Sequence, residues 1–131
     1  MTGTSKRYRA SALVFIDNKL LLVRDKGKRD YSLPGGGYKS KESTMEACPR
    51  ELREEVGGLF VKSVERLKQC DFNGIRARHK VALLKASGKP YVKSKEIDKV
   101  ILWDMQENLK VQGHVRRILN CYLTMNKTQG E

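Results

Sequence analysis

The chain has 131 residues, the length of one globular domain with a core large enough to fold without disulfides. It carries 27 lysine and arginine residues against 15 aspartate and glutamate residues, so its formal charge is +12 and polyanions are the expected partners. No apolar run approaches the roughly 18 to 20 residues of a membrane span, and the polar start MTGTSKRYR lacks the apolar middle of a signal peptide. We therefore expect one cytoplasmic domain over residues 1–131, without membrane contact.

The first half of the chain predicts a hairpin followed by a glycine turn. Residues 11–23 hold the apolar runs ALVFI and LLLV around a DNK turn, a pattern typical of a buried β-hairpin. The basic residues 24–29 are expected to form a loop, and residues 31–33 a short strand that ends at Pro34. The three glycines at 35–37 then permit backbone conformations closed to other residues, and they allow close approach of a ligand or another segment.

Residues 43–56 are expected to form a helix. Ser43 followed by Glu46 matches a capping box. Pro49 cannot donate its backbone hydrogen bond and costs about 3 kcal/mol inside a helix, so either the helix bends there or its regular part begins just before the proline. The upstream capping box favours the bend. Apolar residues recur at helical spacing and predict a buried stripe of Met45, Cys48, Leu52 and Val56.

The second half predicts more strands and a last helix. Glycines 57 and 58 are expected to stop the first helix, and residues 88–90, GKP, to interrupt the chain again. Apolar residues between 112 and 125 fit one face of an amphipathic helix, and residues 126–131 are expected to be a flexible tail. The strands are expected at residues 60–67, 75–86 and 99–103.

The three cysteines do not indicate a metal or disulfide site. Cys48, Cys70 and Cys121 are odd in number, far apart and outside any CxxC spacing. We expect reduced and mostly buried thiols.

Five carboxylates gather between residues 36 and 58, GGYKSKESTMEACPRELREEVGG. On a helix, Glu51, Glu54 and Glu55 stand at i, i+3 and i+4 and share one face. Such close like charges are tolerated when a divalent cation lies between them, and all-oxygen ligation suits Mg²⁺ or Mn²⁺. The segment therefore predicts a metal site. The other interpretation, a solvated charged surface helix, is typical of a run such as ELREE taken alone.

The spacing of this segment closely resembles the Nudix box of Nudix (MutT-like) hydrolases. The preceding YSLPGGG also resembles the strand and turn that lead into the box. One position departs from the pattern, because Gly58 stands where an aliphatic residue is expected and Leu59 follows one place late. We expect this departure to affect packing rather than metal binding. The matching positions are Gly36, five residues, Glu42, seven residues, Arg50-Glu51-Leu52, one residue, Glu54-Glu55, one residue and Gly57.

The resemblance implies a fold and a reaction. The fold is α/β, an α/β/α sandwich with a mixed central sheet and the Nudix loop-helix motif. The reaction is hydrolysis of a diphosphate bond in a nucleoside diphosphate linked to a group X, assisted by Mg²⁺ or Mn²⁺. Bound cations neutralise phosphate oxygens and acidify water, and phosphoryl transfer depends mainly on positioning and charge stabilisation.

The resemblance also assigns roles to residues. The metal ligands would be the three helix glutamates Glu51, Glu54 and Glu55, with the backbone carbonyl of Gly36. Glu42 and Gly37 would be structural within the site, and Arg50 would tie the loop to the helix and orient a ligating glutamate. The first candidate for general base is Glu54, and the second is Glu96 in the loop before the last strand. The catalytic group is thus Glu54, Arg50 and Glu96.

Substrate recognition is expected from residues outside the box. Nucleoside triphosphates, including oxidised ones, are the first candidate substrates for a small chain. The positive charge favours longer polyphosphates, namely dinucleoside polyphosphates, diphosphoinositol polyphosphates or an RNA 5′ end, whereas ADP-ribose ranks lower because short chains lack the extra domain that many such enzymes use to dimerise. A non-catalytic module that binds nucleotides or RNA is the alternative of another class, and the chain is a monomer or a homodimer. The candidate substrate-binding residues are Arg9, Arg24, Arg76, Arg78 and Lys39.

Overall fold

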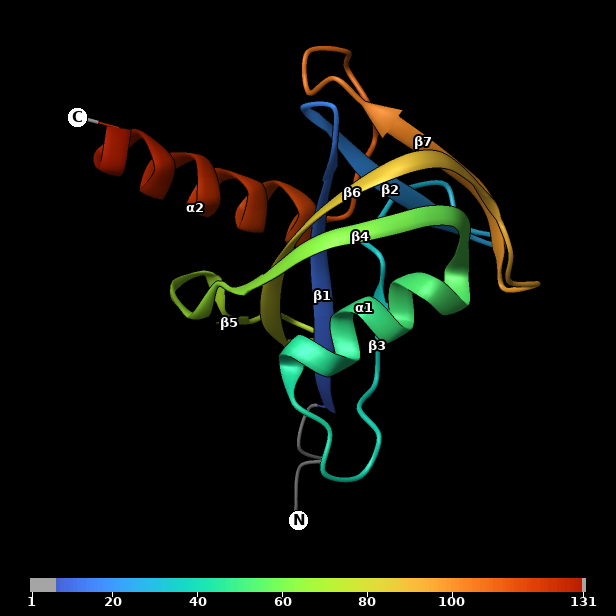
Figure 1. Ribbon diagram of the computed structural model, residues 1–131, viewed down its shortest axis with the longest axis horizontal. Coiled ribbons are helices and arrows are strands. Elements are labelled where there is room, and N and C mark those ends of the chain that lie inside the picture. Colours follow the sequence, from blue (N-terminus) through green and yellow to red (C-terminus); the bar gives the residue numbers. More distant parts are fainter. Residues whose placement is uncertain (1–6, 131) are drawn as a thin grey trace.

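The computed structural model describes the backbone of residues 7–130 and the side chains of residues 7–126. One sheet and two helices make up the domain (Figure 1). None of the helices in this part of the chain is long and apolar enough to cross a membrane. In chain order the elements are β1 Arg7–Ile16, β2 Lys19–Asp25, β3 Gly35–Gly36, α1 Thr44–Glu55, β4 Val56–Arg66, the 3₁₀ turn η1 Lys68–Cys70, β5 Phe72–Asn73, β6 Ala77–Val92, β7 Ile97–Trp103 and α2 Gly113–Gly130.

The sheet is mixed. Its strand order is β4-β6-β1-β2-β7, with β3 paired to β1 and β5 paired to β6. The central pair β1 and β6 is parallel, and the other pairs are antiparallel. The chain between β1 and β6 includes α1, since parallel neighbours need a long connection. This topology places the expected box helix beside the centre of the sheet.

The two helices cover opposite faces of the sheet (Figure 1). Ala47, Cys48 and Leu52 of α1 pack on one face, in a core that includes Val14 of β1. On the other face α2 contributes to a second core, into which it buries Val115, Ile118 and Leu119. The expected α/β/α sandwich with a mixed sheet is confirmed.

The hairpin between β1 and β2 turns at Asp17 and Asn18. Both residues adopt left-handed backbone angles, φ 50° and 66°, as a two-residue hairpin turn requires, and short polar side chains tolerate this conformation. The predicted hairpin is therefore present.

The strand expected at residues 31–33 is wrong, because only isolated bridges form there, at Tyr31 and Ser32. The extended pairing lies further along, where Gly35 and Gly36 run antiparallel to β1. A Cβ atom at Gly35 would stand 2.1 Å from the carbonyl oxygen of Ala10. Only glycine permits this approach. Gly35 and Gly36, which were expected to form a turn, therefore form strand β3.

Helix α1 begins as the capping box predicts. The backbone N–H of Glu46 donates to the Ser43 hydroxyl, and the Glu46 carboxylate accepts from the Ser43 N–H at 3.0 Å. The helix starts at Thr44 and passes through Pro49, so the alternative start next to the proline is wrong. Met45, expected in the buried stripe, is 43% exposed; Thr44 and Ala47 are buried on that side of the first turns instead.

Glycines 57 and 58 do not stop the helix, because Val56 already adopts an extended conformation and starts β4. Both glycines lie within that strand, at a bulge between Gly57 and Leu59. Gly58 has φ +84° and faces Gly88 of β6, which has φ +115°. The extra residue shifts the strand by one position, so that Leu59 packs against the α1-side core. The bulge thus gives the late aliphatic residue an inward position.

Other boundaries also differ from those expected. Strand β6 runs through residues 88–90 to Val92, because the glycine sits in the bulge rather than in a turn. The segment between the strands expected at residues 60–67 and 75–86 contains the short strand β5, and β7 begins two residues early at Ile97. Helix α2 continues through residues 126–130, where no proline or early glycine stops it, and Glu131 lies outside the described residues.

Candidate active site

Arg50 is the hub of the candidate site. Its guanidinium donates to both oxygens of Glu42, at 2.6 and 2.8 Å, and to the carbonyl oxygen of Gly37 at 2.8 Å. The same group reaches Glu51 at 2.9 Å and Glu54 at 3.1 Å. One planar side chain therefore ties the loop before α1 to two glutamates on the helix, a task that suits the fixed fork of arginine.

The Glu42 carboxylate accepts hydrogen bonds from two residues. Besides Arg50, it accepts from the backbone N–H of Lys39 at 2.9 Å. The hydrogen bonds from Arg50 lower the pKa of Glu42 to about 2 and raise the pKa of Arg50 well above its ordinary value. The pair is therefore charged at any pH in ordinary use, and the loop stays closed onto the helix.

Glu51 lies against the glycine turn. A Cβ atom on Gly36 would stand 2.5 Å from the nearer carboxylate oxygen of Glu51, so the absence of a side chain there leaves room for the carboxylate. Gly37 has open space around its Cα instead, and its role in the network is its carbonyl oxygen. Glu54 is 51% exposed and Glu51 only 14%, so the site opens to solvent on the Glu54 side.

Glu55, the last residue of α1, contacts Gly35, the neighbour of the glycine against which Glu51 lies. Its Oε1 accepts from the backbone N–H of Gly35 at 3.2 Å. Burial raises its pKa to about 8, against the opposing effect of Arg9 and the Gly35 N–H. A carboxyl group in this position gains from any cation that approaches it.

The oxygen donors of this cluster fit a hard divalent cation in kind. In the side-chain positions described, however, Arg50 is the positive partner of Glu51 and Glu54, while Glu55 turns to Gly35. Accordingly, no three carboxylate, imidazole or thiol groups in the described part of the chain converge on one metal position. Glutamate side chains change rotamer without backbone movement, so ligation requires rotation of these side chains and no change of fold.

The second candidate for general base, Glu96, lies in the loop between β6 and β7. This loop touches the end of α1, because the Lys93 N–H donates to the Glu55 carbonyl at 3.1 Å. Glu96 is exposed and its carbonyl accepts from Lys26 N–H at 2.8 Å. The structure therefore brings the Glu96 loop to the C-terminal end of α1.

Of the five basic candidates, Arg9 is the one whose charge acts on Glu55. It donates to the Leu33 carbonyl at 2.8 Å. Arg24 is occupied by an ion pair with Asp98 at 2.9 Å. The other three are placed differently: Arg78 lies in β6, whereas Arg76 precedes the strand and Lys39 is exposed in the loop.

A buried polar cluster next to Arg9 was not expected from the sequence. His79 accepts or donates a 2.9 Å hydrogen bond with Ser11, and His114 accepts from the Leu33 N–H at 3.3 Å. The two imidazoles stack with centroids 4.8 Å apart. Leu33 lies two residues before β3. Its N–H is thus bound by His114 and its carbonyl oxygen by Arg9. Nothing in the sequence pairs these residues, whose hydrogen-bonded partners lie 24 or more positions apart.

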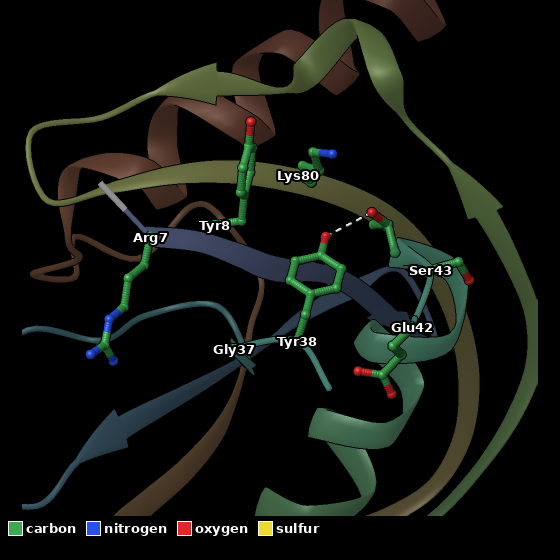
Figure 2. Close-up of a pocket in the computed structure, with 8 residues that line it drawn as sticks. Arg7, Tyr8, Gly37, Tyr38, Glu42, Ser43 and Lys80 are labelled. Carbon is green, nitrogen blue, oxygen red and sulfur yellow. Dashed lines mark hydrogen bonds between the residues drawn. The ribbon is translucent and has the colours of Figure 1, made fainter. Parts of the chain in front are cut away.

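An open pocket of about 510 Å³ lies at the N-terminal end of α1 (Figure 2). Gly37, Tyr38 and Glu42 form its wall on the loop side, and Tyr38 donates to or accepts from Thr44 at 2.7 Å. The wall on the sheet side includes Tyr8 and Lys80, which the sequence analysis did not nominate. Only the parallel pairing of β1 with β6 brings them together.

Comparison with known proteins agrees with this geometry. The family model described as the NUDIX domain matches residues 6–118. The chain belongs to the Nudix family. A relative from Lactococcus lactis subsp. cremoris, named "Probable DHNTP pyrophosphohydrolase", is 38% identical over 58 residues. That match covers 44% of this chain and 34% of the relative, so the chain aligns with about a third of the relative's length.

Solved structures of Nudix proteins share the fold. One assigned to the nudix hydrolase family from Chromobacterium violaceum is 28% identical with a TM-score of 0.78, over 95% of this chain and 82% of that one. A MutT NUDIX hydrolase from Burkholderia pseudomallei is 20% identical, TM-score 0.73, over 89% and 98%. An ADP-ribose pyrophosphatase from Streptococcus suis is 18% identical, TM-score 0.68, over 92% of each chain. The latter two matches bear on the fold alone.

Proposed function

We propose that this Nudix protein hydrolyses a diphosphate bond in a nucleoside diphosphate linked to a group X, with a divalent cation as cofactor. The observation that carries the proposal is the single guanidinium of Arg50, which holds Glu42, Glu51, Glu54 and the Gly37 carbonyl together. A surface helix that is merely solvated has no need of such a shared contact, whereas a set of carboxylates that must be presented together does.

Each residue has a distinct task in this proposal. Glu51, Glu54 and Glu55, with the Gly36 carbonyl, would hold Mg²⁺ or Mn²⁺, which when bound neutralises phosphate oxygens and acidifies water. Arg50, which binds both Glu51 and Glu54, would position these carboxylates for the cation. Glu54, the most exposed of the glutamates, is the first choice for removing a proton from the attacking water, and Glu96 is the second.

Nucleoside triphosphates, oxidised ones included, remain the first substrates to test. The Lactococcus lactis relative is named a pyrophosphohydrolase, which agrees with cleavage of a diphosphate bond. Chain length does not argue against ADP-ribose, because the Streptococcus suis ADP-ribose pyrophosphatase aligns over 92% of both chains. The high positive charge supports longer polyphosphates.

A panel of nucleotides tests the proposal. Nucleoside triphosphates, ADP-ribose, a dinucleoside polyphosphate and a diphosphoinositol polyphosphate are incubated with the protein and Mg²⁺ or Mn²⁺, and released phosphate, diphosphate and monophosphates are measured. We expect hydrolysis of at least one nucleotide and none in the presence of excess EDTA. The control is the Glu51→Gln/Glu54→Gln double variant. Tight binding without hydrolysis by the wild-type protein would favour the non-catalytic binding module.

A further inference from the structure

Two hollows lie side by side on the surface next to the candidate site. The first is the pocket of about 510 Å³ at the start of α1 (Figure 2), and the second has about 260 Å³. Both are lined by Tyr8 of β1 and Lys80 of β6. Tyr8 and Lys80 therefore lie between the two hollows. The two hollows together form one elongated surface basin, which is called the basin below.

The basin is positively charged although two acidic residues line it. Glu42, in the first hollow, is bound through both oxygens to Arg50. Asp71, in the second, is bound through both oxygens to Arg66, at 2.7 Å each. Each carboxylate is thus neutralised by a paired arginine behind the basin wall.

The cations of the basin have no such neutralising partner. Arg7 and Lys80 line the first hollow, and Arg78 and Lys80 line the second. None of the three forms an ion pair with a carboxylate among the described side chains, residues 7–126. A row of unpaired cations in a surface basin attracts the phosphates of an extended anion.

Aromatic side chains stand between these cations. Tyr8 is 47% exposed, and its ring lies 4.6 Å from the Lys80 ammonium and 5.4 Å from the Arg78 guanidinium. In the second hollow, Phe72 stacks on His79 with centroids 4.7 Å apart. Phe72 is half-buried, with the Arg117 guanidinium 4.3 Å from its ring centroid, so Tyr8 is the ring exposed for stacking. An exposed ring among cations in a groove suits single-stranded nucleic acid, through base stacking and backbone contacts.

The basin begins where the candidate site ends. Gly37 and Glu42 line the first hollow, and both also bind Arg50. Arg50 in turn binds Glu51 and Glu54. Arg50 is therefore the side chain that connects the helix glutamates to the first hollow. A ligand whose phosphates lie at the glutamates can extend past Arg50 into that hollow.

We propose that this basin, with Tyr8 at its centre, holds the nucleotides that follow the 5′-terminal one in a single-stranded RNA whose 5′ polyphosphate lies at the glutamates. The proposal rests on the proposed function: the nucleoside of the substrate is the 5′-terminal one of an RNA chain, and X is the terminal phosphate of its 5′ polyphosphate. A mononucleotide would fill only the part of the site beside the glutamates, whereas the RNA would use both hollows.

Binding is measured first, without divalent metal, so that it does not depend on catalysis. The probe is a 3′-fluorescent single-stranded RNA of six nucleotides with a 5′ triphosphate, and its anisotropy is followed from 50 to 300 mM salt. For single strands the slope of log K against log salt is about −0.7 for each phosphate contact. We expect the triple variant Arg7→Gln/Arg78→Gln/Lys80→Gln to reduce the magnitude of the slope by about 2. The matched control is Lys85→Gln, exposed on the same strand, which leaves it unchanged.

The aromatic contact is tested separately. Tyr8→Ala is expected to weaken RNA binding by about five-fold or more, the usual effect of losing one stacked base, and Tyr8→Phe to restore it. Under Mg²⁺, Tyr8→Ala lowers kcat/KM for the RNA but leaves that for the matching nucleoside triphosphate within about two-fold.

Three outcomes would overturn the proposal: an unchanged salt slope in the triple variant, equal losses on RNA and on the nucleoside triphosphate, or a Tyr8 effect confined to a dinucleoside polyphosphate. Failure of the proposed function looks different, since no nucleotide is then hydrolysed while the metal-free binding results still decide whether the basin holds RNA.

Discussion

Arg50 grips Glu42 with two parallel hydrogen bonds, from Nε to Oε2 at 2.6 Å and from Nη2 to Oε1 at 2.8 Å. Because the same guanidinium reaches the Gly37 carbonyl and two glutamates on α1, it fixes the loop and the helix in one arrangement. The geometry of the site therefore depends on the planar fork and not only on a positive charge.

Arg50→Lys keeps the charge and removes the fork. We expect kcat/KM with saturating Mg²⁺ to fall by about 10²-fold, since displacement of a positioned group by an ångström has effects of that size. Arg53→Lys is the matched control, because Arg53 is exposed on the same helix and forms no ion pair with the described side chains. Equal activity of the two variants would show that charge alone suffices at position 50.

Glu54→Gln preserves the size of the side chain and removes its charge. Because Glu54 is 51% exposed, we expect the melting temperature to change little, while turnover falls by about 10² to 10⁴-fold, the range for loss of a general base. Steady-state kinetics with Mg²⁺, beside a thermal melt, checks both parts. Near-normal activity would remove Glu54 from the mechanism, and Glu96→Gln would then be measured as the second candidate.

Gly58→Ala and Gly27→Ala separate backbone strain from a steric clash. Both glycines have similar left-handed angles, φ +84° and +82°, but only at Gly58 would a Cβ meet another atom, the Lys89 carbonyl oxygen at 2.2 Å. We expect Gly27→Ala to lower the free energy of unfolding by about 1 to 2 kcal/mol, and Gly58→Ala to lower it further. Urea denaturation measures the difference. Equal losses would mean that the bulge adjusts freely.

Acid destabilises the chain through His79, which is buried, and His114, which is half-buried. Burial, with a smaller effect of Arg9, lowers the pKa of His79 to about 4 and of His114 to about 3, whereas both titrate near 6.5 when unfolded. The unfolded chain therefore binds more protons between these values. The stability that the neutral rings provide is complete above pH 6.5 and is lost as the pH falls toward 4, by up to about 1.4 kcal/mol per pH unit for each ring.

The histidine effect is isolated by comparison with His114→Gln, which keeps a hydrogen-bond acceptor for Leu33. Between pH 7 and pH 5, the free energy of unfolding of the wild type should fall by about 1 to 2 kcal/mol more than that of the variant. Glu55, whose pKa is raised to about 8, titrates with the opposite sign but does so in both proteins and cancels. A constant difference between the two proteins would contradict the neutral state of His114.

The box and its helix could be predicted because their information is local. Spacing along one helix identifies Glu51, Glu54 and Glu55, and the contact between Ser43 and Glu46 spans only three residues. The metal site itself stays a prediction.

The rest depends on which distant segments pair, and spacing along the chain carries no such information. Lys80 meets Tyr8 only because β1 and β6 are parallel neighbours. Gly58 and Gly88, expected as breaks, instead accommodate each other across two strands. The structural effect of these glycines was mispredicted for the same reason. A glycine can end an isolated helix or strand, but within a sheet it can also lie where two backbones approach closely.

Helix α1 passes into β4 without a loop, Glu55 being its last residue and Val56 the first of the strand. The last turn of α1, which carries Glu54 and Glu55, is therefore directly continuous with the sheet. No flexible linker separates the helix from β4. Amide protons of residues 54–57 should exchange almost as slowly as those of the central strands, while those of the exposed loop residues Ser40 and Lys41 exchange fast. Any local opening of the site that admits a substrate then begins in the loop before α1, which Arg50 binds through Gly37 and Glu42.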